Sequence, residues 1–297
     1  MELFFQPQIE DRDRIASYLT KGKQRACDYS PANLILWSGV YHTKIAYVND
    51  WMLIQFGKRQ NTCFAWPMGD GDRREIFRWI ENYCREQNLP VRFNPVEPEM
   101  MDILEELYPG QYEVSYQRDN ADYIYRCEDL KNLSGKKYHG KKNYINRFRR
   151  LYDNWNYERI TDDNTEDCIR MAEEWCRQNA CDSSDVGKQE EMCNLIRGLE
   201  NREALRMKGG LIRIDGRVVA MTLGEAIQSD TFIIHYEKAF SDIPGAYTMI
   251  NQQFIEHELA AFTYVNREED LGLPGLRKAK ESYRPVSMVE KGIARKK

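Results

Sequence analysis

The order of secondary-structure signals along the chain is the feature that most limits its possible folds. A β-hairpin, a strand, a helix, a strand, a helix and a final strand are predicted in the first half, and the same order follows in the second half. Asn49-Asp50 marks the first hairpin turn, and Asp215-Gly216 marks the second with the strongest short hairpin signal in the chain. The pattern predicts an α/β (α+β) protein with two similar parts, each a mixed, mostly antiparallel sheet flanked by helices.

Hydrophobic periodicity and turn residues place these elements along the chain. The first half is predicted to contain a hairpin at 44–56, a strand at 62–66, a helix at 72–87, a strand at 91–93, a helix at 98–108 and further strand at 112–125. The second half is predicted to contain a hairpin at 210–223, a strand at 231–236, a helix at 245–261, a strand at 262–265, a helix at 276–283 and a last strand at 286–289.

The length of the chain also favours two domains. Its 297 residues exceed one average domain. A polar stretch at 128–132 separates the two repeats. We therefore expect a supporting N-terminal domain over 1–128 and a C-terminal domain over 129–297 that carries the active cleft.

Several classes of protein are excluded by composition. No apolar run approaches the roughly 20 residues that a membrane helix needs, and the N-terminus does not read as a secretory signal, so we expect a cytoplasmic protein without integral membrane association. The eight cysteines show no C-x-x-C spacing and only four histidines accompany them, so no metal site is expected. The net charge of −4 predicts no general affinity for polyanions.

One local exception to that charge balance is the run from Lys131 to Arg150, which contains no acidic residue. Helical spacing predicts that Tyr138, Ile145, Phe148 and Leu151 form its buried stripe, so the remaining face is strongly positive. Such a face can neutralise the phosphates of a nucleic acid, and it can equally meet lipid head groups or another protein. The candidate polyanion-binding residues are Lys136, Lys137, His139, Lys141, Lys142 and Arg147.

Two segments of the second half are rich in polar side chains where predicted strands end. The first is His235-Tyr236-Glu237-Lys238-Ala239, which continues to Ile243-Pro244-Gly245-Ala246-Tyr247. The second runs from Asn266-Arg267-Glu268-Glu269-Asp270-Leu271-Gly272 through Lys278-Ala279-Lys280 to Ser282-Tyr283-Arg284-Pro285. Strand ends are where open α/β sheets place ligand groups.

Together with the basic run, these segments resemble a bacterial family that is similar to the C-terminal domain of phosphatidylglycerol lysyltransferases. The resemblance covers nearly the whole chain, and the run from Asn266 to Lys280 is its most specific part. It implies two tandem acyl-CoA N-acyltransferase (GNAT)-like domains, of which the second holds the active cleft. In the lysyltransferases that cleft moves an aminoacyl group from a transfer RNA to a lipid hydroxyl. Those enzymes also carry a multi-span membrane region that this chain lacks, so we expect a soluble acceptor instead.

A coenzyme A donor is the alternative that the helix start at Gly245-Ala246 favours. Acetyl-coenzyme A enzymes resemble one another in a loop with a basic residue or Gln and two small residues, whose backbone N–H groups hold the pyrophosphate. In this chain the first glycine and the basic residue of that loop are missing. Acetyl- or acyl-coenzyme A therefore stands second to aminoacyl-transfer RNA as the expected donor.

Aminoacyl transfer requires a carboxylate for the amine, a base or proton relay, and donors for the oxyanion. Glu237 and His235 lie one strand period apart and are predicted to face the same side. With Asp270 they are the candidate catalytic residues, although Asp270 and Glu268 can also simply precede a helix start. The candidate substrate-binding residues are Asn266, Glu268, Arg277, Lys278 and Lys280.

Three functions are open on the sequence alone. The first is an aminoacyl transferase that uses a charged transfer RNA and a small-molecule or peptide acceptor, and the basic run favours it. The second is a coenzyme A-dependent N-acyltransferase acting on a small amine or peptide. The third is a non-catalytic protein that binds an amino acid or a peptide, because no sharp catalytic constellation is present and fold alone does not assign function.

Overall fold

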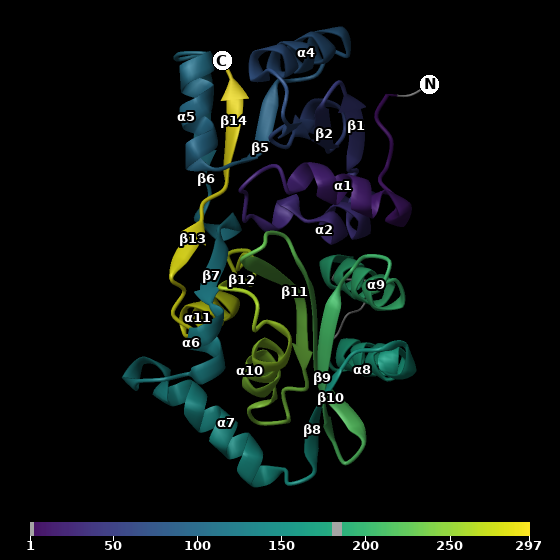
Figure 1. Ribbon diagram of the computed structural model, residues 1–297, viewed down its shortest axis with the longest axis vertical. Coiled ribbons are helices and arrows are strands. Elements are labelled where there is room, and N and C mark those ends of the chain that lie inside the picture. The colour runs from purple at the N-terminus through teal and green to yellow at the C-terminus, as the bar shows by residue number, and fades with distance from the viewer. Residues whose placement is uncertain (1–2, 180–185) are drawn as a thin grey trace. The chain divides into compact units, whose positions relative to one another are not determined.

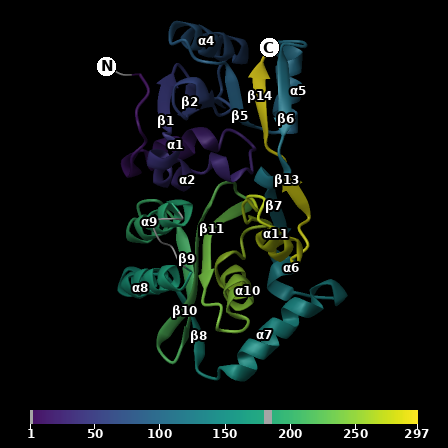
Figure 2. The same ribbon diagram turned by 180° about the vertical axis from the view of Figure 1, so that it is seen from behind.

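The computed structural model describes residues 3–179 and 186–297, and it contains two seven-stranded mixed sheets flanked by helices (Figures 1 and 2). The expected fold class is thereby confirmed. Cys181 lies outside the described residues. Within them, none of the helices combines the length and the apolar composition needed to cross a bilayer.

The first sheet has the strand order β1-β2-β3-β5-β14-β6, and β4 pairs with β2. Its strands are β1 (Lys44–Val48), β2 (Trp51–Phe56), β3 (Cys63–Phe64), β4 (Met68–Gly69), β5 (Arg92–Val96), β6 (Tyr112–Tyr116) and β14 (Gly292–Lys296). The helices of this part are α1 (Arg12–Leu19), α2 (Pro31–Leu36), α3 (Ser38–Tyr41), α4 (Arg73–Glu86) and α5 (Pro98–Leu107).

The second sheet has the strand order β13-β7-β12-β11-β10-β9-β8. Its strands are β7 (Asp122–Arg126), β8 (Trp155–Arg159), β9 (Lys208–Ile214), β10 (Arg217–Ala226), β11 (Thr231–Ala239), β12 (Tyr264–Asn266) and β13 (Ser287–Val289). The helices are α6 (Cys127–Asn132), α7 (His139–Leu151), α8 (Asp162–Gln178), α9 (Val186–Glu200), α10 (Ala246–Glu258) and α11 (Pro274–Glu281). In both ribbon views α8 and α9 lie on one side of the sheet and α10 lies on the other (Figures 1 and 2).

The predicted hairpins form because their turn residues tolerate the left-handed backbone. Asn49 has a φ of 52°, and Asp215 and Gly216 have φ values of 49° and 82°. The following strand pairs antiparallel with the hairpin in each sheet, and the strand after the next helix pairs with it in parallel. The two halves of the chain therefore build their sheets by the same steps.

Each sheet also contains one strand from the other half of the chain, which the sequence analysis did not predict. β14 lies between β5 and β6 in the first sheet, where Figure 1 shows it in yellow between strands drawn in blue. β7 takes the corresponding place between β12 and β13 in the second sheet. The stretch 112–125 was expected as further strand of the first half. It instead contains β6 and β7, which belong to different sheets.

Because of this exchange of strands, each compact unit of the fold contains segments from different parts of the chain. One unit comprises Met1–Asp122, Glu269–Leu273 and Met288–Lys297, and the other comprises Tyr123–Glu268 and Pro274–Ser287. From the sequence, all of 129–297 was expected to form one domain. The structure differs from that expectation because the pairing of β14 with β5 and β6 adds the end of the chain to the first unit.

We predict that the first unit depends on β14 for its stability. Ala294 is fully buried and lies opposite Phe93 on one side and Val114 on the other. Ala294→Glu would bury an unpaired carboxylate and should cost about 3–5 kcal/mol in the free energy of unfolding by urea. Arg295→Gln, at an exposed position of the same strand, should stay within about 0.5 kcal/mol of the wild type. Equal losses in the two variants would contradict this role for β14.

Candidate active site

In the second sheet, β11 continues beyond the end of its parallel neighbour β12, and charged residues gather there. β11 and β12 pair from Thr231–Tyr264 to Ile233–Asn266, where β12 ends, while β11 continues to Ala239. The carboxyl ends of parallel strands are the usual place for ligand groups in open sheets. Glu237 lies on the continuing part of β11, and Arg267 follows β12 directly.

Glu237 and Arg267 form an ion pair beside the end of β12. The Nη2 atom of Arg267 lies 2.7 Å from Oε1 of Glu237, and the side-chain amide of Asn251 on α10 donates to Oε2 at 2.9 Å. The side chains of Glu237 and Arg267 are only 10% and 12% exposed. Because a buried carboxylate is stable only when it is paired and hydrogen-bonded, Arg267 and Asn251 stabilise the side chain of Glu237 and fix its direction.

The ring of Tyr283 contacts two basic side chains, that of Arg267 and that of Lys141. The guanidinium carbon of Arg267 lies 4.7 Å from the centroid of the Tyr283 ring, and the Nζ atom of Lys141 lies 3.6 Å from the same centroid. Both distances are within the range of cation–π attraction. We call this set of side chains the Glu237 cluster: Glu237, Arg267, Asn251, Tyr283 and Lys141.

His235 lies in a second group of charges on the same strand. Its Nδ1 atom is 2.8 Å from Oε1 of Glu268, and its Nε2 atom is 3.3 Å from Oε1 of Glu225 on β10. Burial alone would lower the pKa of His235, but the hydrogen bonds to Glu225 and Glu268 outweigh burial and raise that pKa to about 9. At neutral pH His235 is therefore a buried imidazolium between two carboxylates.

The expected common face for His235 and Glu237 is interrupted by an irregularity in the pairing of β10 with β11. Leu223 lies opposite Tyr236, whereas Gly224 lies opposite Ile234, so the register passes over His235. Such an irregularity breaks the alternation of side chains along a strand. Among the described residues, His235 and Glu237 share no hydrogen-bond partner.

Two of the predicted substrate-binding residues, Asn266 and Lys280, hold the backbone after β12. The side chain of Asn266 accepts a hydrogen bond from the N–H of Glu268 at 2.6 Å, and Glu268 has a left-handed φ of 59°. The ammonium of Lys280 donates to the carbonyl oxygens of Arg267 and Glu268. On α11, Arg277 is half-buried and Lys278 is exposed.

Asp270 belongs to the first compact unit, where its own partners hold it. Its carboxylate is fully buried, pairs with Arg118 at 3.2 Å and accepts a hydrogen bond from the N–H of Gly272 at 2.9 Å. The structure therefore brings Asp270 together with Arg118 and a tight turn. Glu237 and the residues of its cluster all belong to the second unit.

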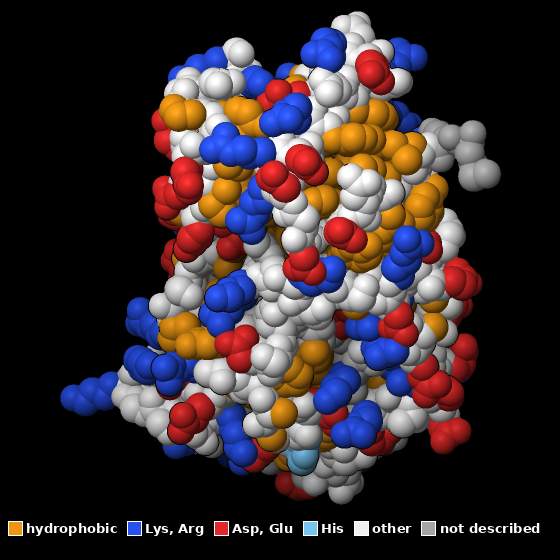
Figure 3. All heavy atoms as spheres, turned by 45° about the horizontal axis from the view of Figure 1, so that its top comes forward, with side chains coloured by type: hydrophobic (Ala, Val, Ile, Leu, Met, Phe, Trp, Pro, Cys, Tyr) orange, Lys and Arg blue, Asp and Glu red, His pale blue; other side chains and the backbone are white. Residues whose placement is uncertain are grey.

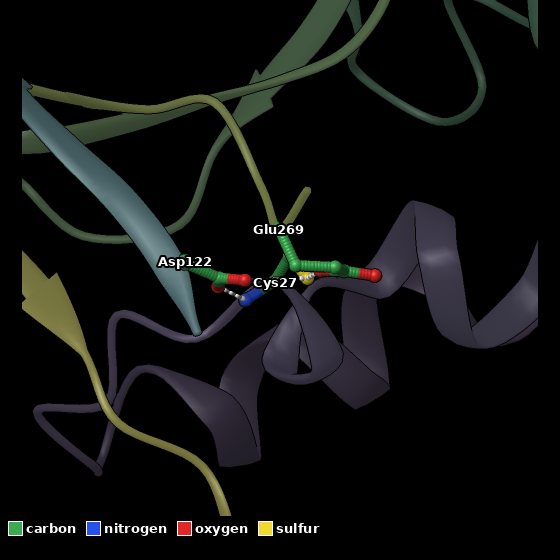
Figure 4. Close-up of side chains that lie close together, drawn as sticks. All are labelled: Cys27, Asp122 and Glu269. Atoms are coloured by element: carbon green, nitrogen blue, oxygen red, sulfur yellow. Dashed lines mark hydrogen bonds between the residues drawn. The ribbon is translucent and has the colours of Figure 1, made fainter. Parts of the chain in front are cut away.

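The first unit holds one group of side chains with the spacing of a metal site. Figure 4 shows Cys27, Asp122 and Glu269, whose ligand atoms lie within 4.8 Å of one another. The Nζ atom of Lys291 lies among them, 2.8 Å from Asp122 and 3.2 Å from Glu269. Burial lowers the pKa of Lys291, but the carboxylates, Asp122 first, outweigh it and raise that pKa well above its usual value. The lysine ammonium supplies the positive charge that these carboxylates need.

The basic run forms α7 and the turn before it, largely as predicted. Tyr138, Ile145 and Phe148 are buried, but Leu151 is 50% exposed because the helix ends there. Five of the six candidate polyanion-binding side chains are exposed to solvent: Lys136, Lys137, His139, Lys142 and Arg147. The sixth, Lys141, is half-buried and belongs to the Glu237 cluster. Over most of the face in Figure 3, Lys and Arg are mixed with Asp and Glu.

Three members of the Glu237 cluster, Arg267, Tyr283 and Asn251, were not predicted from the sequence as site residues. Arg267 is the only basic residue in the run 266–270, and this isolated positive charge beside a strand end was a usable signal. Tyr283 lies in a segment that carried the resemblance, but its role was not assigned. Asn251 lies within the predicted helix 245–261. Its partner Glu237 lies on β11, so no local sequence feature indicates this contact.

Comparisons with known proteins show similarity over almost the whole chain. The family model described as "Phosphatidylglycerol lysyltransferase, C-terminal" matches residues 20–295. A conserved protein of unknown function from Bacteroides thetaiotaomicron is similar in structure with a TM-score of 0.95 and 38% identity over 100% of both chains. No curated protein matches the chain.

Two more distant structures share the fold. The C-terminal domain of a protein described as a lysylphosphatidylglycerol synthetase from Agrobacterium fabrum has a TM-score of 0.70 at 12% identity, covering 97% of this chain and 92% of its own. The structure of L-PGS from Bacillus licheniformis has a TM-score of 0.67 at 15% identity, covering 97% of this chain and 93% of its own. The family resemblance expected from the sequence is confirmed.

We predict that the charge of His235 stabilises the protein in a pH-dependent way. The pKa of His235 is raised from 6.5 to about 9 by folding, so its contribution is complete below about pH 6.5 and is lost as the pH rises through 9. The free energy of unfolding of the wild type should fall by about 3 kcal/mol relative to His235→Gln across this interval. His139→Gln, which removes an exposed imidazole, serves as the control. A difference between wild type and His235→Gln that stays constant from pH 6 to pH 10 would contradict the prediction.

Proposed function

The chain belongs to the family of phosphatidylglycerol lysyltransferase C-terminal domains, and from this premise we propose that it is an acyltransferase that moves an aminoacyl group from a transfer RNA to a small soluble acceptor. The single observation that carries the proposal is the position of Lys141. This residue lies on the basic helix α7, yet its ammonium lies on the ring of Tyr283 beside Arg267. A surface suited to phosphates is thus continuous with a group of side chains suited to acyl transfer.

The Glu237 cluster supplies the groups that acyl transfer requires. The ester carbonyl of an aminoacyl-transfer RNA becomes an oxyanion when the acceptor attacks it, and fixed positive groups stabilise that oxyanion. Arg267 and Lys141 provide two positive charges against the single negative charge of Glu237. The cluster therefore has a surplus of positive charge when both cations are protonated.

Glu237 can recognise the amino group of the aminoacyl moiety. An ionised carboxylate offers about four acceptor positions on its two oxygens. Arg267 and Asn251 each occupy one position, on Oε1 and Oε2 respectively. The remaining acceptor capacity suits an ammonium group, and the fixed direction of the carboxylate favours selection for it.

The coenzyme A alternative receives less support from the start of α10. Gly245 has a φ of 91°, and a Cβ atom there would lie 2.5 Å from the carbonyl oxygen of Tyr144 on α7. The close packing of α7 therefore accounts for the glycine without a pyrophosphate ligand. Coenzyme A is the alternative donor, and the experiment below compares its binding directly with that of lysyl-transfer RNA.

The experiment is a titration of the purified protein with lysyl-transfer RNA and with acetyl-coenzyme A at two salt concentrations. We expect salt-sensitive binding of the RNA, because each neutralised phosphate releases counterions. Accelerated loss of the lysyl group on mixing would distinguish an enzyme from a protein that only binds. Tight coenzyme A binding without RNA affinity would contradict the proposal and favour an ordinary N-acyltransferase.

Charge reversal on α7 gives the sharpest form of this test. The double variant Lys142→Glu/Arg147→Glu should weaken RNA binding at least about tenfold. The slope of the logarithm of the binding constant against the logarithm of the salt concentration should decrease by about one for each phosphate that the protein no longer neutralises. The double variant Lys58→Glu/Lys208→Glu changes the net charge equally at exposed positions that are not on α7, and it should bind nearly as the wild type. Equal weakening in both variants would show that α7 is not the RNA-binding surface.

A further inference from the structure

Lys141 differs from the other basic residues of α7 in what surrounds its ammonium. Its side chain is half-buried, and its Nζ atom lies over the ring of Tyr283, which is itself only 5% exposed. Its neighbour Lys142 is exposed, and Lys137 pairs with Asp129 on α6. Lys141 thus extends from the basic surface into the Glu237 cluster.

The charged and titratable groups that face Lys141 come from three other segments. Glu237 lies on β11, Arg267 follows β12, and Tyr283 follows α11. Burial and then repulsion by Arg267 lower the pKa of Lys141 to about 8, while Glu237 opposes that change. Within the part of the chain that the structure describes, Lys141 forms no ion pair that would hold its proton. The protonation state of this amine is therefore expected to change near pH 8.

The other titratable side chains nearby are less suited to move a proton. Glu237 is held by Arg267 and Asn251 on both of its oxygens. The side chain of His235 is 1% exposed and lies between two carboxylates that keep it charged. Lys280 donates to two backbone carbonyl oxygens. Among the described residues, Lys141 is the member of this set whose amine forms neither a hydrogen bond nor an ion pair, and its contact is with the ring of Tyr283.

We propose that Lys141 is the proton-transfer group of the acyl-transfer reaction, a role that rests on the proposed function. The neutral amine of Lys141 takes the proton from the attacking amine or hydroxyl of the acceptor. The acceptor nitrogen or oxygen forms a bond to the ester carbonyl carbon, which becomes tetrahedral. The former carbonyl oxygen becomes an oxyanion beside Arg267. When this intermediate collapses, the bond from that carbon to the ribose oxygen breaks, and the ammonium of Lys141 returns the proton to the ribose oxygen.

This assignment uses one group for both halves of the reaction. The proton gained in the first step is the proton lost in the second, so Lys141 ends as the neutral amine in which it began. A group serves best in both directions when its affinity for a proton is matched to the working pH. The cation left after the first step also lies beside the oxyanion and stabilises it.

The titration of Lys141 can be measured without a substrate. In protein labelled with ¹³C-lysine, the side-chain signal that disappears in Lys141→Arg identifies this residue, and its chemical shift is followed against pH. We expect a midpoint near pH 8 and a lower midpoint in Glu237→Gln, which removes the opposing negative charge. A midpoint in the ordinary range of a solvated lysine would overturn the proposal.

The second measurement is the single-turnover loss of the lysyl group from lysyl-transfer RNA, with water as the acceptor. The wild-type rate should rise with pH and level off with an apparent pKa near that of Lys141. Lys141→Arg keeps the charge, so RNA affinity should stay within about twofold, while the rate should fall at least about 100-fold. Lys208→Arg is the matched control, since Lys208 is an exposed lysine that also lies over an aromatic ring, that of Phe262.

The two possible failures are distinguishable. If Lys141→Arg hydrolyses lysyl-transfer RNA as fast as the wild type, the proton-transfer role is overturned and the proposed function stands. If the wild type neither binds nor deacylates lysyl-transfer RNA, the proposed function fails and the role of Lys141 fails with it, even where the lysine titrates near pH 8.

Discussion

Both compact units depend on the ion pairs that four consecutive charged residues, 267–270, form with partners elsewhere in the chain. Each of these side chains is largely withdrawn from water, and each has an ion-pair partner of opposite charge in its own unit. A buried charge that loses its partner is strongly destabilising, so the pairs fix the direction in which every one of these side chains points. The pairs are Arg267 with Glu237, Glu268 with His235, Glu269 with Lys291, and Asp270 with Arg118. Ion pairing therefore explains the four charged residues near the start of the most specific sequence run, Asn266 to Lys280.

The local parts of the fold could be predicted because their causes are local. The turn at Asp215-Gly216 and the amphipathic spacing of the helix 72–87 each lie within a short window, and both elements were found. The exchange of β7 and β14 could not be predicted in this way. β14 pairs with strands almost 200 residues earlier in the chain, and a strand carries no local signal for a partner at that distance. The single strand expected over 112–125 fails for the same reason.

The candidate site was predictable one residue at a time, but its arrangement was not. Strand period and position singled out Glu237, and the absence of acidic residues singled out α7. The alternation that would have placed His235 beside Glu237 is broken by an irregular register, which depends on the pairing of two strands. Arg267 and Asn251 reach Glu237 from two other elements, so only the tertiary fold brings them together. Lys141 was expected on the basic surface, and the fold turns it toward Tyr283 instead.

We propose above all that the basic helix α7 and the Glu237 cluster form one site for the end of an aminoacyl-transfer RNA. A stable analogue in which an amide replaces the ester, a 3′-lysylamino-3′-deoxyadenosine, presents the reacting end without its reaction. The most direct measurement is backbone hydrogen exchange with and without this analogue. The account predicts slower exchange on binding in α7 near Lys141, in β11 near Glu237 and just after β12. Binding that leaves these three segments unchanged and protects residues of the first unit would contradict it.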